Sequence, residues 1–306
     1  MRWDDFRRSD NIEDDRDGGG GGFGGGFGIP GGGGGLGIGT VVVLGLVGWA
    51  LGIDPGVLIG GAEMLNRGGG SQYQQPYQQA NRRTGAPKDQ AGDFVAAVLG
   101  NTEDTWSKIF QDGGQQYRAP RLRLFAGSVQ GGCGFAQAAM GPFYCPSDRR
   151  IYLDTSFFRA IETRFRGCQG KACKFSQAYV IAHEVGHHVQ NLLGVLPKAR
   201  AEQRAAGSKV AANRIQVRVE LQADCFAGVW ANRSEQRKQF LDPGDIDAAL
   251  QTATAIGDDT LQKRAQGRIV PDAFTHGSAE QRKRWFMTGF TQGKLAACNT
   301  FTAAQL

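Results

Sequence analysis

This sequence of 306 residues contains few cysteines and no large excess of positive or negative charge. Six cysteines are too few to staple a miniature disulfide-rich fold over this length. The 35 basic and 29 acidic residues are interspersed, so the net charge of +6 indicates a solvated surface and predicts no nucleic-acid partner. Histidine is rarer still: the chain has four, and three of them fall within residues 183–188.

Long apolar runs are also rare, and only one has the length to cross a membrane. Leu36–Ile53 contains eighteen residues without a charge, close to the about 20 that span the hydrocarbon core of a bilayer. A buried core helix is the alternative, but the flanking stretches are too polar and glycine-rich to cover it. We therefore expect a transmembrane helix at residues 36–54, in contact with the lipid bilayer.

Composition divides the rest of the chain into three parts. Residues 1–35 are first highly charged and then glycine-rich, which is typical of a disordered tail. Residues 55–90 are rich in glutamine, glycine and proline and are expected to form a linker. Residues 91–306 remain as one folded domain. Basic residues flank the apolar run on both sides and do not orient it, whereas the cysteines favour a domain outside the cytoplasm.

The folded domain is predicted to be α+β and mostly helical, with a small sheet. A first helix is expected from residue 93 to residue 110, followed by a strand at 121–129 and two short strands within 142–154. The later helices are expected at residues 156–165, 175–193, 210–233, 243–257 and 278–293. Ser278, with Gln281 three residues later, forms a capping box at the start of the last helix.

The pattern H-E-x-x-H occurs at His183, Glu184 and His187. Residues four apart on a helix lie on the same face, so both imidazoles can bind one metal ion. Glu184 beside the first ligand can take a proton from a water on that metal. The uncharged residues around the motif are typical of a buried helix, and the pattern predicts one zinc ion per chain.

A catalytic zinc ion needs a third protein ligand. The metzincin pattern is excluded, because Gln190 and Leu193 stand where it requires glycine and histidine. Glu220 and Asp224 lie one helical turn apart in an otherwise apolar helix. We therefore expect Glu220 to be the third ligand and Asp224 to accept the outer N–H of a ligand imidazole. A surface glutamate and an unrelated aspartate are the alternative.

Three further residues are candidates for the site. His276 precedes the last helix and is expected to stabilise an oxyanion over the metal, although a lone histidine there is often structural. Arg282 is expected to share that role or to orient Asp224. His188 lies about 100° from His187 around the helix, so we interpret it as a supporting or packing residue and not as a ligand.

The cysteines are expected to form disulfides, because their spacing does not make a four-cysteine zinc site. Local spacing favours two short loops and leaves one distant pair. This spacing suggests Cys133 with Cys145 and Cys168 with Cys173, which leaves Cys225 and Cys298; spacing alone does not fix the connectivity.

Several long segments resemble the bacterial neutral zinc metallopeptidase family. They are MRWDDFRRSDNIEDDR, GPFYCPSDRRIYLD, AHEVGHHVQ, ELQADCFAGVWA and FTHGSAEQRKRWFMTGF. The resemblance covers nearly the whole chain and implies a zincin-like domain behind a single span of the bacterial inner membrane. The H-E-x-x-H followed by E-x-x-x-D is similar to the gluzincin arrangement, which implies the ligands and base named above.

The expected function is hydrolysis of peptide bonds by a zinc-activated water, on a peptide or protein substrate. One alternative is a zinc amidase that acts on cell-wall amide bonds, and another is a catalytically silent scaffold that keeps zinc for structure. Glu184 disfavours the scaffold, because a structural zinc site needs no base. We also expect an extended substrate to pair with the sheet edge near Ile151–Asp154.

Overall fold

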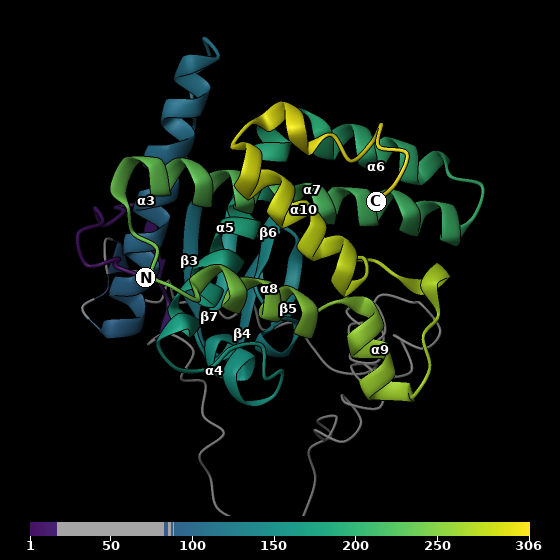
Figure 1. The fold of residues 1–306 in the computed structure, drawn as a ribbon, viewed down its shortest axis with the longest axis horizontal. Helices are drawn as coiled ribbons and strands as arrows, with labels where there is room; N and C mark the ends of the chain where they lie inside the picture. The colour runs from purple at the N-terminus through teal and green to yellow at the C-terminus, as the bar shows by residue number, and fades with distance from the viewer. Residues whose placement is uncertain (17–82, 85–86, 88) are drawn as a thin grey trace, which may run out of the picture.

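The computed structural model describes residues 1–16, 83–84, 87 and 89–306 (Figure 1). The predicted transmembrane helix at 36–54 and most of the predicted linker lie outside these residues. Within the described ranges, no helix is both long enough and apolar enough to cross a bilayer. The fold is α+β and mostly helical, as the sequence predicts.

A five-stranded sheet has the strand order β2-β1-β3-β7-β6. Its strands are β1 (Ile12–Asp14), β2 (Arg83–Thr84), β3 (Arg121–Phe125), β6 (Phe143–Cys145) and β7 (Arg150–Asp154). Strand β3 pairs in parallel with both β1 and β7, and β6 pairs antiparallel with β7. A separate hairpin joins β4 (Ser128–Gly131) to β5 (Gly134–Gln137). The predicted strand at 121–129 is therefore two strands, because the chain turns at Gly127, where φ is +75°.

Alternation along the strands separates two apolar layers. Leu122, Leu124 and Leu153 belong to the main core beneath the helices, whereas Phe125 and Tyr152 belong to a small core beside the hairpin. The sheet therefore lies between the helices and the β4–β5 hairpin. Among the described residues its two edge strands are β2 and β6, and β6 contacts helix α5 (Cys173–Leu192).

The helices match most of the predicted ranges. They are α3 (Gln90–Asp112), α4 (Ser156–Thr163), α5, α6 (Val195–Ala205), α7 (Lys209–Lys238), α8 (Asp245–Ala255), α9 (Asp258–Gln266) and α10 (Ala279–Gln292). Ser278 and Gln281 form the predicted capping box of α10. Helices α6 and α9 were not predicted from the sequence, because they are short and strongly charged and have few buried residues.

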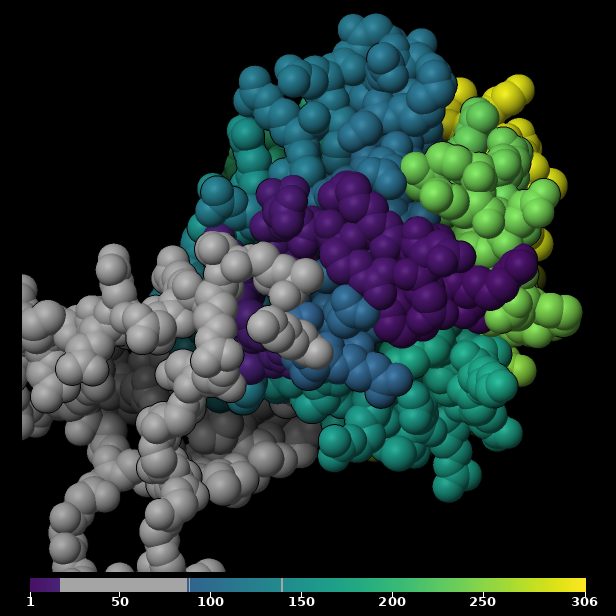
Figure 2. All heavy atoms as spheres, turned by 90° about the vertical axis from the view of Figure 1, so that its left-hand side faces the viewer, coloured from purple at the N-terminus to yellow at the C-terminus, as the bar shows by residue number. Residues whose placement is uncertain are grey.

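The first residues of the chain belong to the fold, and the prediction of a disordered tail is wrong for residues 1–16. Figure 2 shows this segment in purple, lying across the blue residues that include α3. Phe6 and Ile12 are buried in the main core, and Arg8 forms an ion pair with Asp93 of α3 at 2.7 Å. The sequence predicted a solvated tail because Arg7, Arg8 and Glu13 have their partners more than 80 residues away. The folded domain consequently includes residues 1–16 as well as 91–306.

The predicted linker also needs correction at its end. Arg83–Thr84 forms β2 and pairs with β1, while α3 already begins at Gln90. Strands before and after residues 36–54 thus share one sheet, so both lie on the same side of any membrane. A single crossing between them would place them on opposite sides. The single-pass arrangement predicted from the sequence does not agree with this sheet.

Helices α5, α7 and α10 pack closely through glycines. A methyl group on Gly186 of α5 would lie 2.9 Å from the Ala223 carbonyl oxygen of α7. Between α7 and α10 the approach is closer, since a methyl group on Gly228 would lie 2.1 Å from the Phe286 carbonyl oxygen. Only glycine allows these backbone separations. The crossings place residues of three helices around one point (Figure 1).

All three predicted disulfides are present. Cys133–Cys145 ties the β4–β5 hairpin to the edge strand β6. Cys168–Cys173 closes a short loop at the start of α5, and Cys225–Cys298 joins α7 to the C-terminal segment. None of these cysteines is free.

Candidate metal centre

The three predicted ligands converge on one point between α5 and α7. The Nε2 atoms of His183 and His187 lie 3.1 Å apart. The Oε2 atom of Glu220 lies 3.2 Å from the first and 3.3 Å from the second. Ligand atoms around a tetrahedral zinc ion at about 2.0–2.1 Å stand about 3.3 Å from one another. The triangle therefore has the size that such an ion requires.

Hydrogen bonds to the other ring nitrogens set the tautomers of both histidines. His183 Nδ1 lies 2.8 Å from Asp224 Oδ1, and His187 Nδ1 lies 2.9 Å from Gln190 Oε1. The amide of Gln190 donates to the Val219 carbonyl, which directs its oxygen to His187. Each Nδ1–H therefore donates outward, and each Nε2 keeps a lone pair. Two such lone pairs facing a carboxylate oxygen need a cation between them, so the donor set fits zinc.

Asp224 is the centre of a fully buried polar network. Arg282 of α10 donates to both of its oxygens, at 2.8 and 2.9 Å, and Tyr179 donates to Oδ1 at 2.6 Å. Burial disfavours the carboxylate, but Arg282 and His183 outweigh burial and hold the pKa of Asp224 far below its usual value. Arg282 thus orients Asp224, one of the two roles expected for it.

The electrostatic field at the centre favours positive charge. Burial disfavours the imidazolium of His183, but the adjacent Asp224 raises its pKa to about 10. Burial likewise disfavours ionised Glu220, yet His187 and His276 keep its pKa well below the usual range. Gln216 donates to Oε1 of Glu220 at 2.7 Å and leaves Oε2 facing the histidines. A divalent cation satisfies the same field without a proton.

Glu184 is buried beside the triangle and lines a cleft of about 470 Å³. The part of the chain that the structure describes offers it no hydrogen-bond partner. The cleft also contains His183, His187 and Glu220, so the carboxylate and the three candidate ligands face one space. A water in this space could reach both a metal ion and a free carboxylate.

His276 lines the same cleft from the loop before α10. Its backbone N–H and those of Thr275 and Gly277 donate to Asp258, which fixes the loop. The imidazole is 53% exposed, and its Nδ1 lies 3.4 Å from Asp258. Burial lowers the pKa of His276, but Glu220 and Asp258 raise it above the usual value overall. The structure thus brings the imidazole of His276 to the cleft from the loop before α10.

His188 does not reach the triangle. Its Nε2 donates to the Arg118 carbonyl at 2.6 Å, and its Nδ1 accepts from the Tyr144 hydroxyl at 3.1 Å. Burial lowers its pKa to about 4, so the ring is neutral. The expectation of a supporting contact to the ligands is wrong, and the packing alternative describes the residue better. It joins α5 to the edge strand β6.

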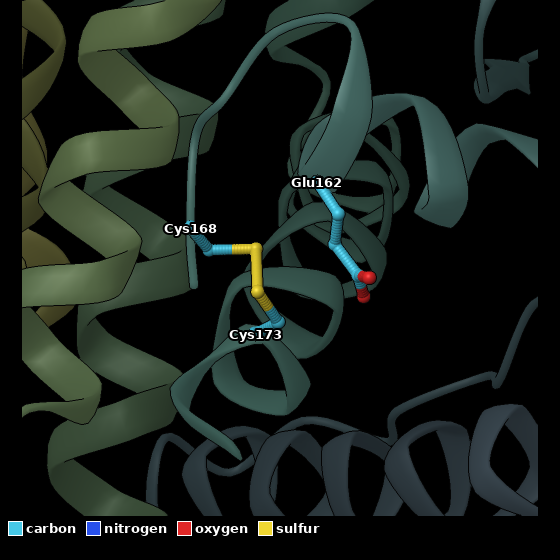
Figure 3. A group of neighbouring side chains, drawn as sticks. All are labelled: Glu162, Cys168 and Cys173. Atoms are coloured by element: carbon cyan, nitrogen blue, oxygen red, sulfur yellow. A yellow bond between two sulfur atoms is a disulfide. The ribbon is translucent and has the colours of Figure 1, made fainter. Parts of the chain in front are cut away.

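A second group of metal-binding side chains is formed by Glu162, Cys168 and Cys173. Figure 3 shows that the two sulfurs are bonded to each other beside the carboxylate of Glu162. A disulfide sulfur is not the thiolate that binds zinc. The triangle at His183, His187 and Glu220 is therefore the better candidate among the residues described.

Three supporting residues were missed in the sequence, namely Tyr179, Gln190 and Gln216. A helical signal exists for each of them. Tyr179 lies four residues before His183, Gln216 lies four before Glu220, and Gln190 lies three after His187, so each shares a helix face with a ligand. The roles of Tyr179 and Gln190 in supporting the site can be recognised only once the facing helix α7 is in place.

The chain is similar to known proteins over almost its whole length. The family profile described as "Putative neutral zinc metallopeptidase" matches residues 1–301. The uncharacterized protein YpfJ of Escherichia coli (strain K12) is 46% identical over 301 residues, which cover 98% of this chain and 99% of YpfJ. The uncharacterized protein Rv2575 of Mycobacterium tuberculosis is 42% identical over 266 residues, which cover 84% of this chain and 85% of Rv2575. No solved structure matches the chain.

Proposed function

Because the chain belongs to the neutral zinc metallopeptidase family, we propose that it hydrolyses peptide bonds in a zinc-dependent reaction with Glu184 as the general base. One observation carries this proposal. The Nε2 atoms of His183 and His187 and the Oε2 atom of Glu220 converge at 3.1–3.3 Å in a cleft that also contains Glu184. A structural zinc site needs no such neighbouring carboxylate.

The residues of the cleft have distinct roles in this reaction. Zinc, when bound by His183, His187 and Glu220, would lower the pKa of a water and polarise the substrate carbonyl. Glu184 accepts the proton of the attacking water and later gives it to the leaving amine. The imidazole N–H of His276 donates a hydrogen bond to the negative oxygen that develops on the substrate.

Strand β6, at one edge of the sheet, is the proposed place for the substrate backbone. The edge expected near Ile151–Asp154 is wrong, because β7 is paired on both sides, with β3 and β6. Strand β6 is an edge strand, and its Phe143 and Tyr144 line the cleft. An extended peptide can add to such an edge through backbone hydrogen bonds. Peptides with single N-methylated amides should therefore show raised KM at alternate positions; an equal KM at every position would exclude strand addition.

The three disulfides support a location for the folded domain outside the cytoplasm. Cytoplasmic thiols are kept reduced, whereas all six cysteines here are paired. Trapping thiols in living cells with an alkylating agent should modify none of the six. Modification of most of them would place the domain in the cytoplasm.

The decisive experiment measures bound zinc and proteolysis on the whole chain. We expect one zinc ion in wild type and in Glu184→Gln, and none in Glu220→Ala, while Glu184→Gln loses hydrolysis of a denatured protein. Glu162→Ala is the matched control, because it removes a carboxylate from the other cluster and should keep zinc. Zinc retained by Glu220→Ala would rule out this ligand set, and activity on purified cell wall alone would favour an amidase.

A further inference from the structure

The two ends of the cleft differ in chemistry. It follows one face of α5, past Val180, Glu184 and His187. Helices α4 and α8 contact α5, and Phe157 of α4 and Leu261 of α9 line the cleft. Helix α6, which begins just after α5 ends, lines it through Leu196 and Arg200. In Figure 1, α6 and α9 lie on opposite sides of α10. The candidate ligands therefore stand between two different walls.

The wall near Val180 is apolar. Phe157 and Phe165 lie with ring centroids 6.0 Å apart, and both rings are only half-buried although they line a concave space. Ile256, directly after α8, and Leu261 of α9 add partly exposed aliphatic surface. Burying such surface against a ligand removes it from water and is favourable. This end fits a bulky apolar side chain.

The wall beyond His187 carries a positive charge. Arg200 of α6 lines the cleft, is exposed, and forms no ion pair with a carboxylate in the ranges described. Gln203, about one helical turn further along α6, donates a hydrogen bond to the Oε1 atom of Gln216 of α7 at 2.8 Å. An exposed guanidinium without a carboxylate partner is available to a ligand carboxylate.

We propose that the cleft selects peptides with a bulky apolar side chain on one side of the scissile bond and a carboxylate on the other. The apolar side chain lies against Phe157, Phe165 and Leu261, and the carboxylate lies at Arg200. This inference rests on the proposed peptidase function, because the cleft is the proposed active site. The carboxylate can belong to an acidic side chain or to the C-terminus of the peptide.

Binding and turnover test the inference separately. Binding is measured by fluorescence anisotropy on zinc-loaded, full-length Glu184→Gln, with labelled peptides that carry Leu or Ala at one position and Glu or Gln at the other. Free and amidated C-termini distinguish the two sources of the carboxylate. We expect Leu→Ala to weaken binding about tenfold or more. Loss of the carboxylate should weaken it about fivefold, as for an exposed ion pair.

A charge reversal provides the specific control. In the Glu184→Gln background, Arg200→Glu should reverse the preference from Glu-containing to Lys-containing peptides. Arg204→Glu reverses an exposed charge on the same helix outside the cleft and should leave the preference unchanged. Equal affinities across the peptide set, or no peptide binding at all, would overturn the inference. Selective binding without cleavage by wild type would instead refute the peptidase function and leave the inference standing.

Discussion

Two histidines that are adjacent in the chain have opposite environments. His187 directs Nε2 to Glu220, whereas His188 is turned away and anchors α5 to Tyr144 of the sheet edge. The rotation of about 100° per residue in a helix separates them. One histidine therefore belongs to the candidate metal centre and the other to the core that positions it.

Asp224 should matter to zinc affinity although it is not a ligand. In Asp224→Asn, the neutral amide is a weaker acceptor for His183 Nδ1–H, and Arg282 loses its buried counter-charge. We expect zinc affinity to fall about 10–100-fold, measured by competition with a chromogenic chelator. Asp247→Asn makes the same change on the exposed face of α8 and should bind zinc as wild type does. Equal affinities of the two variants would contradict the orienting role.

His188 should make stability depend on pH. Its pKa is about 4 in the folded protein, because burial disfavours the charged ring, and about 6.5 in an unfolded chain. The unfolded state therefore binds more protons between these values, and stability falls as pH drops from about 6.5 towards 4. Above about 6.5 the contribution is complete.

The measurement compares wild type with His188→Gln in denaturant unfolding of the metal-free proteins. Glutamine can still accept from Tyr144 and donate to the Arg118 carbonyl, but it does not titrate. The difference in unfolding free energy should be constant above about pH 6.5 and should shift in favour of the variant at lower pH. A difference that stays constant down to pH 4 would show that His188 titrates normally.

At the scale of elements, the site depends on how closely α5 approaches α7. Each helix carries its own pair of functional residues four apart, and the glycine within H-E-x-x-H allows the two pairs to meet. An added methyl group at Gly186 would lie 3.1 Å from the Ala223 Cα and closer to its carbonyl oxygen. The helices would have to move apart by a few tenths of an ångström.

Gly186→Ala should therefore weaken both the fold and the metal centre. Overpacking of this kind costs about 1–3 kcal/mol, and the displaced Glu220 should bind zinc less tightly. Unfolding in denaturant and chelator competition measure the two effects. Gly207→Ala is the control, since a methyl group there meets nothing within 4 Å and φ is not positive. A wild-type zinc affinity in Gly186→Ala would show that the approach of the helices is not limiting.

At the scale of the whole molecule, the N-terminal segment packs into the same domain as the described residues from 83 onward. Strand β1 lies between β2 and β3. Buried Glu103 of α3 accepts hydrogen bonds from Arg7, Ser9 and Asn11, all in the N-terminal segment. Without these residues, β2 and β3 lose the strand between them, and the Glu103 carboxylate loses these three hydrogen-bond donors.

Deletion of residues 2–16 should destabilise the protein by about 3–6 kcal/mol, from the lost burial of Phe6 and Ile12 alone. Thermal unfolding measures this loss. A synthetic peptide of residues 1–16 should restore part of the Tm, whereas the same peptide with Phe6→Ala and Ile12→Ala should not. An unchanged Tm after deletion would mean that the segment adds no stability to the domain.

The sequence alone determined the local parts of the candidate site. His183 with His187 and Glu220 with Asp224 each follow helical spacing, which is a property of one short segment. Two disulfides follow from close spacing, and the third pair was what remained. Most helix ranges were also predictable, because apolar periodicity is local.

Only the tertiary structure decided which distant segments meet. The partners of Arg7 and Arg8, the pairing of β1 with β3 and the pairing of Arg282 with Asp224 all depend on contacts across more than 50 residues. Which strands become the edges of the sheet also depends on all the other strand pairings. A charged side chain looks the same in sequence whether it faces water or a buried partner. Such pairings are set by the packing of the whole core, so periodicity within one segment does not contain them.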